Sequence, residues 1–74
     1  MCLGVPGKIL TIDGFSATVD FWGTQKTVLL HLVDTPVEVG DWVLDHVGYA
    51  VRKVEPEDLE PMLAMYAELR AAQP

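Results

Sequence analysis

The sequence contains few basic residues and carries a strong acidic excess. Five lysines and arginines stand against eleven aspartates and glutamates, which gives a formal net charge of −6. Proteins that bind nucleic acids hold the phosphate backbone mainly through clusters of Lys and Arg. The charge therefore argues against a nucleic-acid binder, including one with a basic groove on a small barrel. Protein partners with basic surfaces are the expected class of ligand.

Cysteine is scarce as well, since Cys2 is the single one in the chain. One cysteine excludes an internal disulfide and any zinc site built from several thiolates. A reducing, cytoplasmic compartment is therefore expected. The apolar opening of the chain is interrupted at Pro6, Gly7 and Lys8, too early for a signal peptide or a membrane-spanning helix. No membrane association is expected.

Recognisable catalytic constellations are missing too. The chain has no glycine-rich phosphate loop, no second cluster of metal ligands and no serine or cysteine in a triad context. Its 74 residues leave room for one domain with a thin core and no deep substrate cleft. Half of the residues are hydrophobic and 22% are charged, which is typical of a folded globular domain. The sequence predicts a small folded protein that is not an enzyme.

Alternating apolar residues bounded by turn residues predict several short β-strands. An apolar-rich strand over residues 8–12 is followed by residues 13–14, which as Asp-Gly fit a type I′ turn, and by an alternating strand over residues 15–21. A turn at residues 22–24 then leads into a third strand over residues 25–33. This first half of the chain therefore predicts a meander of three strands.

Two further strands are predicted after a loop. Residues 34–40 contain Pro36 and end in glycine, which indicates a loop, and strands follow over residues 42–47 and 49–54 with Gly48 between them as a bulge or bend. Five short strands with no helix between them predict a closed or nearly closed barrel, since closure removes exposed strand edges. The predicted fold class is mainly β: a small five-stranded OB-like barrel followed by a C-terminal α-helix.

The C-terminal segment carries an apolar stripe at helical spacing, formed by Leu59, Met62, Leu63, Tyr66 and Leu69. It predicts a helix over residues 57–72 that packs on the barrel and closes one end of it. Two starting points are open. With Asp58 as the N-cap, Pro61 takes the third helical position, where its missing N–H costs nothing. With a start near Pro56, Pro61 kinks the helix.

Cys2 follows the initiator methionine directly. Met1 is normally removed when a small side chain follows it, and removal would leave a free α-amine beside the thiol. Such a terminus can bind a soft or borderline metal through sulfur, with the metal completing deprotonation of the thiol. The alternative is an incidental thiol near a frayed chain end, which the position alone favours.

His46 is the second candidate ligand, at the predicted end of the fourth strand. A neutral imidazole is a nitrogen donor that iron and nickel accept. The alternative is a histidine packed between Trp42 and Tyr49 and satisfied by a backbone group. His31, mid-strand among leucines, is interpreted as structural or surface-exposed. In a regular strand Asp45 cannot share the face of His46, so no carboxylate–histidine pair is predicted.

The opening residues 1–9, MCLGVPGKI, closely resemble the N-terminal signature of the HypC/HupF family of hydrogenase maturation chaperones. Residues 40–44 (GDWVL) and 46–50 (HVGYA) also look like family features, so the resemblance covers nearly the whole chain. It implies a role in assembling the metal centre of nickel–iron hydrogenases.

The resemblance also implies site residues and partners. In the family, the N-terminal cysteine and the histidine of the His-Val-Gly segment are implicated in holding iron, and here they match Cys2 and His46. The resemblance implies binding to the HypD scaffold, where an Fe(CN)₂CO unit is built, and then to the precursor of the hydrogenase large subunit. Iron would be held transiently, and low-spin ferrous iron that carries cyanide and CO suits a thiolate ligand.

The single domain divides into three parts in this interpretation: residues 1–7 form a metal-binding arm, residues 8–54 the barrel and residues 57–72 the helix. Pro6 and Gly7 fix where the arm leaves the barrel, through the locked φ of proline and the freedom of glycine. The competing interpretation is an adaptor that holds the precursor through its barrel and helix while iron stays on other proteins. The amount of iron on the isolated complex discriminates between the two.

Overall fold

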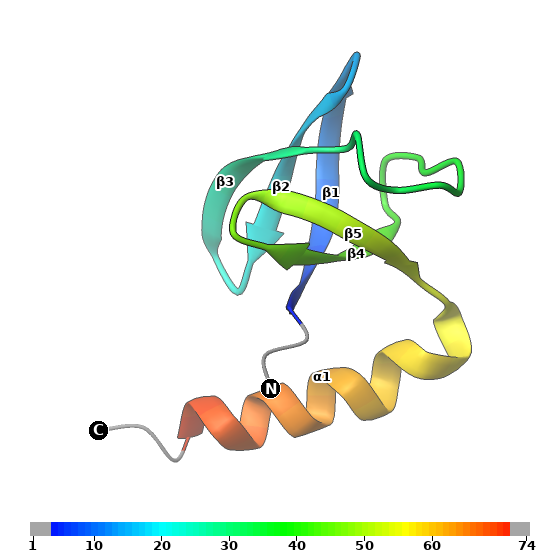
Figure 1. Ribbon diagram of the computed structural model, residues 1–74. Coiled ribbons are helices and arrows are strands. Elements are labelled where there is room, and N and C mark those ends of the chain that lie inside the picture. The colour runs from blue at the N-terminus through cyan, green and yellow to red at the C-terminus, as the bar shows by residue number, and fades with distance from the viewer. Residues whose placement is uncertain (1–3, 72–74) are drawn as a thin grey trace.

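The structure is a computed structural model that describes residues 4–71. Its elements in chain order are β1 (Val5–Asp13), β2 (Ser16–Phe21), β3 (Thr24–Leu29), β4 (Trp42–His46), β5 (Tyr49–Val54) and α1 (Pro56–Ala71). The predicted fold class is confirmed, because the protein is mainly β, with a closed five-stranded barrel followed by a C-terminal helix (Figure 1). Among residues 4–71, no helix has the length and apolar character that crossing a lipid bilayer requires.

The barrel closes in the order β1-β2-β3-β5-β4, with β4 pairing back onto β1. The β1–β2, β2–β3, β4–β5 and β1–β4 pairs are antiparallel. The parallel β3–β5 junction consists of the single pair Leu29 and Tyr49, next to which the Leu29 N–H donates to the Gly48 carbonyl at 3.0 Å. This short junction is the weakest seam of the barrel, since every other seam is a longer ladder.

The core lies inside the barrel and follows the alternation of the strands. Its members are the inward-facing residues Ile9, Ala17, Val19, Val28, Leu30, Val43 and Ala50. Val33 and Val37, from the connection between β3 and β4, pack against this cluster. Because the inward positions are apolar and mostly β-branched, the strands bury the face that points into the barrel. β4 buries both faces at Val43 and Leu44.

The turn between β1 and β2 differs from the predicted one. Asp13 pairs with Ser16, so the central residues are Gly14 and Phe15 rather than Asp13 and Gly14. Gly14 has a φ of 62°, whereas the φ of Phe15 is not positive. A positive φ at the first central residue alone fits a type II′ turn and not a type I′ turn. The prediction of a tight turn was correct, but its register was wrong by one residue.

The third strand is shorter than predicted. β3 ends at Leu29, whereas the alternating pattern predicted a strand through residue 33. The reason is the length of its partner: Leu29 pairs with Ser16, the first residue of β2, so no neighbouring strand remains beyond it. The chain turns instead, with the Val33 N–H donating to the Leu30 carbonyl at 3.2 Å.

Gly48 belongs to a turn and not to a bulge. His46 pairs with Tyr49, and the two residues between them, Val47 and Gly48, have φ values of 55° and 86°. Two positive values are the signature of a type I′ hairpin turn. The predicted fourth strand therefore ends at His46, and the irregularity of this hairpin lies at Val51, which the register skips.

The helix begins at Pro56, as in the second of the two predicted starts. The Glu55 carbonyl accepts the N–H of Asp58 at 3.0 Å and that of Leu59 at 3.1 Å, so Pro56 takes the first helical position, where no N–H is needed. Pro61 lies inside the helix. Asp58 is therefore not the N-cap. Figure 1 shows α1 lying across one end of the barrel, below the start of β1.

The predicted apolar stripe of α1 is half-buried over most of its length, at Leu59, Met62, Leu63 and Tyr66. Its last member, Leu69, is 52% exposed. The helix therefore packs on the barrel from Leu59 to Tyr66, and the stripe extends past the surface that it can cover.

Candidate functional site

The start of β1 is fixed by close packing around a proline and a glycine. Pro6 is fully buried. A Cβ atom on Gly7 would lie 2.4 Å from Val19 Cγ1 and 2.5 Å from Phe21 Cε1, so no side chain fits there unless the side chains of Val19 and Phe21 move. Both residues are part of β1 itself. They anchor the strand from which the N-terminal residues leave, and the strand begins earlier than the predicted residue 8.

Gly4 connects this strand to the helix. It is buried, has a φ of 102°, and a Cβ atom on it would lie 2.9 Å from the Asp45 carbonyl oxygen. The Gly4 carbonyl accepts a hydrogen bond from the Tyr66 hydroxyl of α1. The rings of Trp22 and Tyr66 lie 6.1 Å apart between centroids. Through these contacts of Tyr66, the helix packs against the place where the N-terminal residues leave the barrel.

His46 lies at the same end of the barrel. It is the last residue of β4 and is exposed, which does not fit the alternative of a packed histidine. On the side facing β1, the last pair of the ladder is Val5 with Asp45. One further step along these antiparallel strands leads to Gly4 and His46. We call this region, defined by Gly4, His46 and Tyr66, the arm end.

The carboxyl group of Asp45 is a half-buried neighbour of this site. Its Oδ1 atom is buried and has no hydrogen-bond partner within the described part of the chain. Burial raises the pKa of Asp45, while the Gly48 backbone N–H and the charges of Lys26 and His46 act in the opposite direction. That Asp45 and His46 form no carboxylate–histidine pair stays a prediction.

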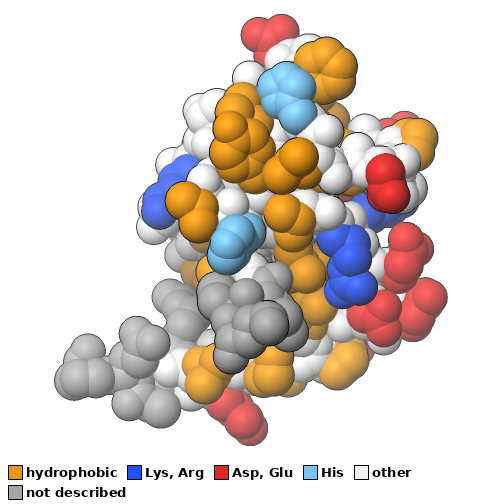
Figure 2. Space-filling model, in the orientation of Figure 1, with side chains coloured by type: hydrophobic (Ala, Val, Ile, Leu, Met, Phe, Trp, Pro, Cys, Tyr) orange, Lys and Arg blue, Asp and Glu red, His pale blue; other side chains and the backbone are white. Residues whose placement is uncertain are grey.

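The other predicted ligand, Cys2, lies outside the described residues. Within residues 4–71, no group of three or more His, Cys, Asp or Glu residues is arranged to hold a metal ion. Figure 2 shows both histidines on one face of the molecule, one of them nearer the end that α1 covers. Of the two predicted iron ligands, the structure therefore places His46 alone.

An open apolar groove of about 390 Å³ lies between α1 and the β4–β5 hairpin, lined by Leu44, Val51, Arg52, Met62, Met65 and Tyr66. Met65 is 52% exposed and Val51 36% exposed. Sequence reasoning assigned no role to Tyr66 beyond the apolar stripe. The available signal was its hydroxyl, because a partly buried tyrosine usually places its O–H against a polar partner.

These features define a small closed-barrel protein in which the exposed His46, the apolar groove and the N-terminal exit lie together at one end. The chain belongs to the HupF/HypC family, because a model of that family matches residues 1–66. The resemblance seen in the opening residues is therefore confirmed over most of the chain.

Curated relatives carry the same family name. The chain is 41% identical over 75 residues to the hydrogenase maturation factor HypC of Cupriavidus necator, which covers 100% of this chain and 82% of that protein. It is 37% identical over 70 residues to HypC of Helicobacter hepaticus, with coverage of 93% and 81%. It is 54% identical over 56 residues to HypC of Escherichia coli, with coverage of 69% and 62%. These relatives are maturation factors by name.

Proposed function

We propose that the chain is a hydrogenase maturation chaperone that helps carry or deliver the Fe(CN)₂CO unit, with Cys2 and His46 as its iron ligands. The observation that carries this proposal is the position of His46, exposed at the end of β4 and one register step beyond the Val5–Asp45 pair. That step leads to Gly4 on the opposite strand. Only Leu3 separates Gly4 from Cys2 in the sequence, so the Cα atoms of Gly4 and Cys2 can be at most about 7 Å apart.

The donor set suits the cargo. A thiolate is a soft ligand, an imidazole is a borderline one, and iron accepts both. Coordination would supply the deprotonation that a free thiol lacks at neutral pH. The close packing at Gly7 and the hydrogen bond from Tyr66 to Gly4 hold the exit of the arm in place. The scaffold therefore fixes one ligand and the base of the segment that carries the other.

The proposed partners are the HypD scaffold, on which the Fe(CN)₂CO unit is built, and then the precursor of the hydrogenase large subunit. The relatives are named hydrogenase maturation factors, and the net charge of −6 suits partners with basic surfaces. We place this role in the cytoplasm, where a lone thiol stays reduced. The protein acts by binding and transfer and not as an enzyme.

Two ligand variants and one matched control test the proposal. In purified complexes with HypD, Cys2→Ser should lower bound iron to background and His46→Ala should lower it partly. His31→Ala, which removes the other exposed histidine, should leave the iron bound per purified complex unchanged, because His31 lies far from α1 and the arm end. His46→Ala should also keep the free energy of unfolding within about 1 kcal/mol of wild type, because an exposed side chain contributes little packing. Iron is counted on the preparations used for the melting curves.

Full iron content and normal hydrogenase maturation with Cys2→Ser would refute the role of the thiol. A destabilised His46→Ala variant that loses iron only in proportion to folded protein would make His46 structural.

A second candidate is an adaptor that binds the precursor and carries no iron. The open apolar groove between α1 and the β4–β5 hairpin favours it, because Met65 and Val51 present apolar surface without any need for a metal. Wild-type complexes with HypD that are free of iron, combined with normal assembly, would select this candidate.

A further inference from the structure

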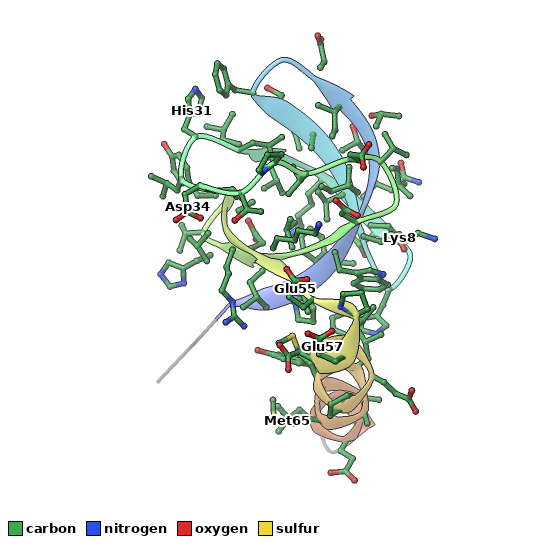
Figure 3. The ribbon with its side chains drawn as sticks, turned by 90° about the vertical axis from the view of Figure 1, so that its right-hand side faces the viewer. Lys8, His31, Asp34, Glu55, Glu57 and Met65 are labelled. Carbon is green, nitrogen blue, oxygen red and sulfur yellow. The ribbon has the colours of Figure 1, made fainter. Side chains whose placement is uncertain are left out.

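The end of the barrel opposite α1 exposes a compact group of apolar and aromatic side chains. Phe15 is 65% exposed and Leu32 is 59% exposed. The ring of Phe15 stacks on that of His31, with centroids 4.7 Å apart and planes inclined by 19°. We call Phe15, His31 and Leu32 the distal patch. Figure 2 shows one histidine among hydrophobic side chains at this end, and Figure 3 places His31 far from α1.

The distal patch is held in position by the barrel. The Phe15 carbonyl accepts the N–H of Leu30 at 2.7 Å, and Leu30 itself is a core residue at 9% exposure. Gly14 sets the direction of the chain into Phe15 through its positive φ. A rigid aromatic ring that remains exposed loses little conformational entropy on binding, and such rings dominate the energetics of protein interfaces. The patch has the form of a preorganised binding surface.

The charges around the distal patch have one sign. The β1–β2 turn with the strand ends beside it and the start of the β3–β4 connection lie in residues 11–18 and 28–36, which contain no lysine or arginine. Asp13 precedes the turn that carries Phe15, and Asp34 follows Leu32 by two positions. Figure 3 shows Asp34 on the same side as His31. A twofold pairing of two copies through this patch would bring these carboxylates together, so a second copy is not its occupant.

We propose that the distal patch docks a different protein, through a surface that presents an arginine next to an apolar side chain. One face of the Phe15 ring is covered by His31, and the other face can receive a guanidinium group by a cation–π contact. Asp13 or Asp34 pairs with the charge, and Leu32 receives the apolar neighbour. The inference rests on the proposed function in one respect, namely that this partner is one of the assembly proteins, HypD or the precursor.

This arrangement gives the molecule two interaction regions at opposite ends. A partner bound at the distal patch leaves the arm end open, so iron can pass at one end while the other end holds the complex together. The variant that separates these roles is Phe15→Ser combined with Leu32→Ser. Its matched control is Val39→Ser, which removes a side chain that is 61% exposed and lies next to Gly40, whose N–H donates to the Ile9 carbonyl in the middle of β1.

The experiment measures the affinity of each variant for purified HypD and for purified precursor separately, by calorimetry at low and high salt. The double variant should bind one of the two at least about tenfold more weakly, with an unchanged melting temperature. Asp13→Asn combined with Asp34→Asn should weaken the same complex and flatten its salt dependence. The Val39→Ser control should bind like wild type.

Each other result decides against the proposal. If wild type binds and the double variant binds equally well, the distal patch is not a docking surface, and the proposed function stands. If the wild type self-associates and the double variant does not, the occupant is a second copy. If wild type binds neither protein, the proposed function and this inference fail together.

Discussion

Each end of the barrel exposes one histidine, and the surroundings of the two side chains differ. At the arm end, His46 lies one register step from the pair Val5 and Asp45, close to the exit of the N-terminal residues. At the distal end, His31 is stacked on Phe15. A histidine beside a thiol-bearing arm suits metal binding, and a histidine that supports an aromatic ring suits a protein contact. The roles that we propose for the two histidines therefore differ because their neighbours differ, although the residue type is the same.

The two ends are also held together differently. The arm end depends on contacts between distant parts of the chain, such as the hydrogen bond from Tyr66 to Gly4, 62 residues apart. The distal end depends on backbone hydrogen bonds of the adjoining turns, from Leu30 to Phe15 and from Val33 to Leu30. Substitutions of side chains should therefore be costly at the arm end and tolerated at the distal end.

The largest expected difference in the free energy of unfolding is between substitutions of one glycine at each end. Gly7→Ala places a Cβ atom 2.4 Å from Val19 and 2.5 Å from Phe21, and overpacking of this kind should cost about 3 kcal/mol. Gly14→Ala meets nothing within 4 Å and should cost less, about 2 kcal/mol, for the strained backbone of an L-residue at this turn position. Urea denaturation of both variants measures the difference. Equal losses at the two positions would contradict the comparison.

Much of the barrel could be predicted from the sequence, because its strands alternate and its turns contain glycine. The end of β3 could not be. Residues 30–33 continue the apolar alternation of the strand, but the pattern holds no information about where the partner strand begins, and β2 begins at Ser16. The β1–β2 turn was misread for a related reason, since Asp-Gly fits two neighbouring registers and cross-strand pairing decides between them.

A smaller difference is expected between the aromatic residues of the two ends. Tyr66→Phe removes the hydroxyl that donates to the Gly4 carbonyl and should lower the free energy of unfolding by about 1 kcal/mol. Phe15→Ser removes a ring that is 65% exposed and should change stability by less than about 0.5 kcal/mol. Thermal melts of the two variants check the order. A more destabilised Phe15→Ser would show that the distal patch stabilises the fold and is not reserved for a partner.

The candidate site, like the barrel, could be predicted from the sequence only in part. The residue types and the family resemblance indicated His46, and the structure shows it exposed at a strand end. No pattern in the sequence indicated that Tyr66 fastens α1 to Gly4, because helical periodicity predicts a buried face without identifying what it covers. The groove was missed as well, since the irregularity at Val51 that shapes its wall depends on the pairing of β4 with β5.

The smallest expected effect is the contribution of Asp45 to the pH dependence of stability, and its direction follows from the pKa shift. Its pKa is raised above its ordinary value of 3.8, chiefly by desolvation, so the folded protein holds this proton more tightly than the unfolded chain does. The stability that the group contributes is therefore present below that ordinary value and is lost as the pH rises through the raised pKa.

Asp45→Asn removes this titration, and the asparagine oxygen can still accept from the Gly48 N–H. As the pH rises from below the ordinary pKa of Asp45 through its raised pKa, the variant should gain stability relative to wild type, and at higher pH the difference should stay constant. The gain should be small, because the Gly48 N–H and the charges of Lys26 and His46 already favour the carboxylate. Melting temperatures across this range test it, with Asp13→Asn as the control for the loss of one negative charge. If wild type gained relative to the variant instead, those three groups would outweigh desolvation, and the carboxylate of Asp45 would stabilise the arm end.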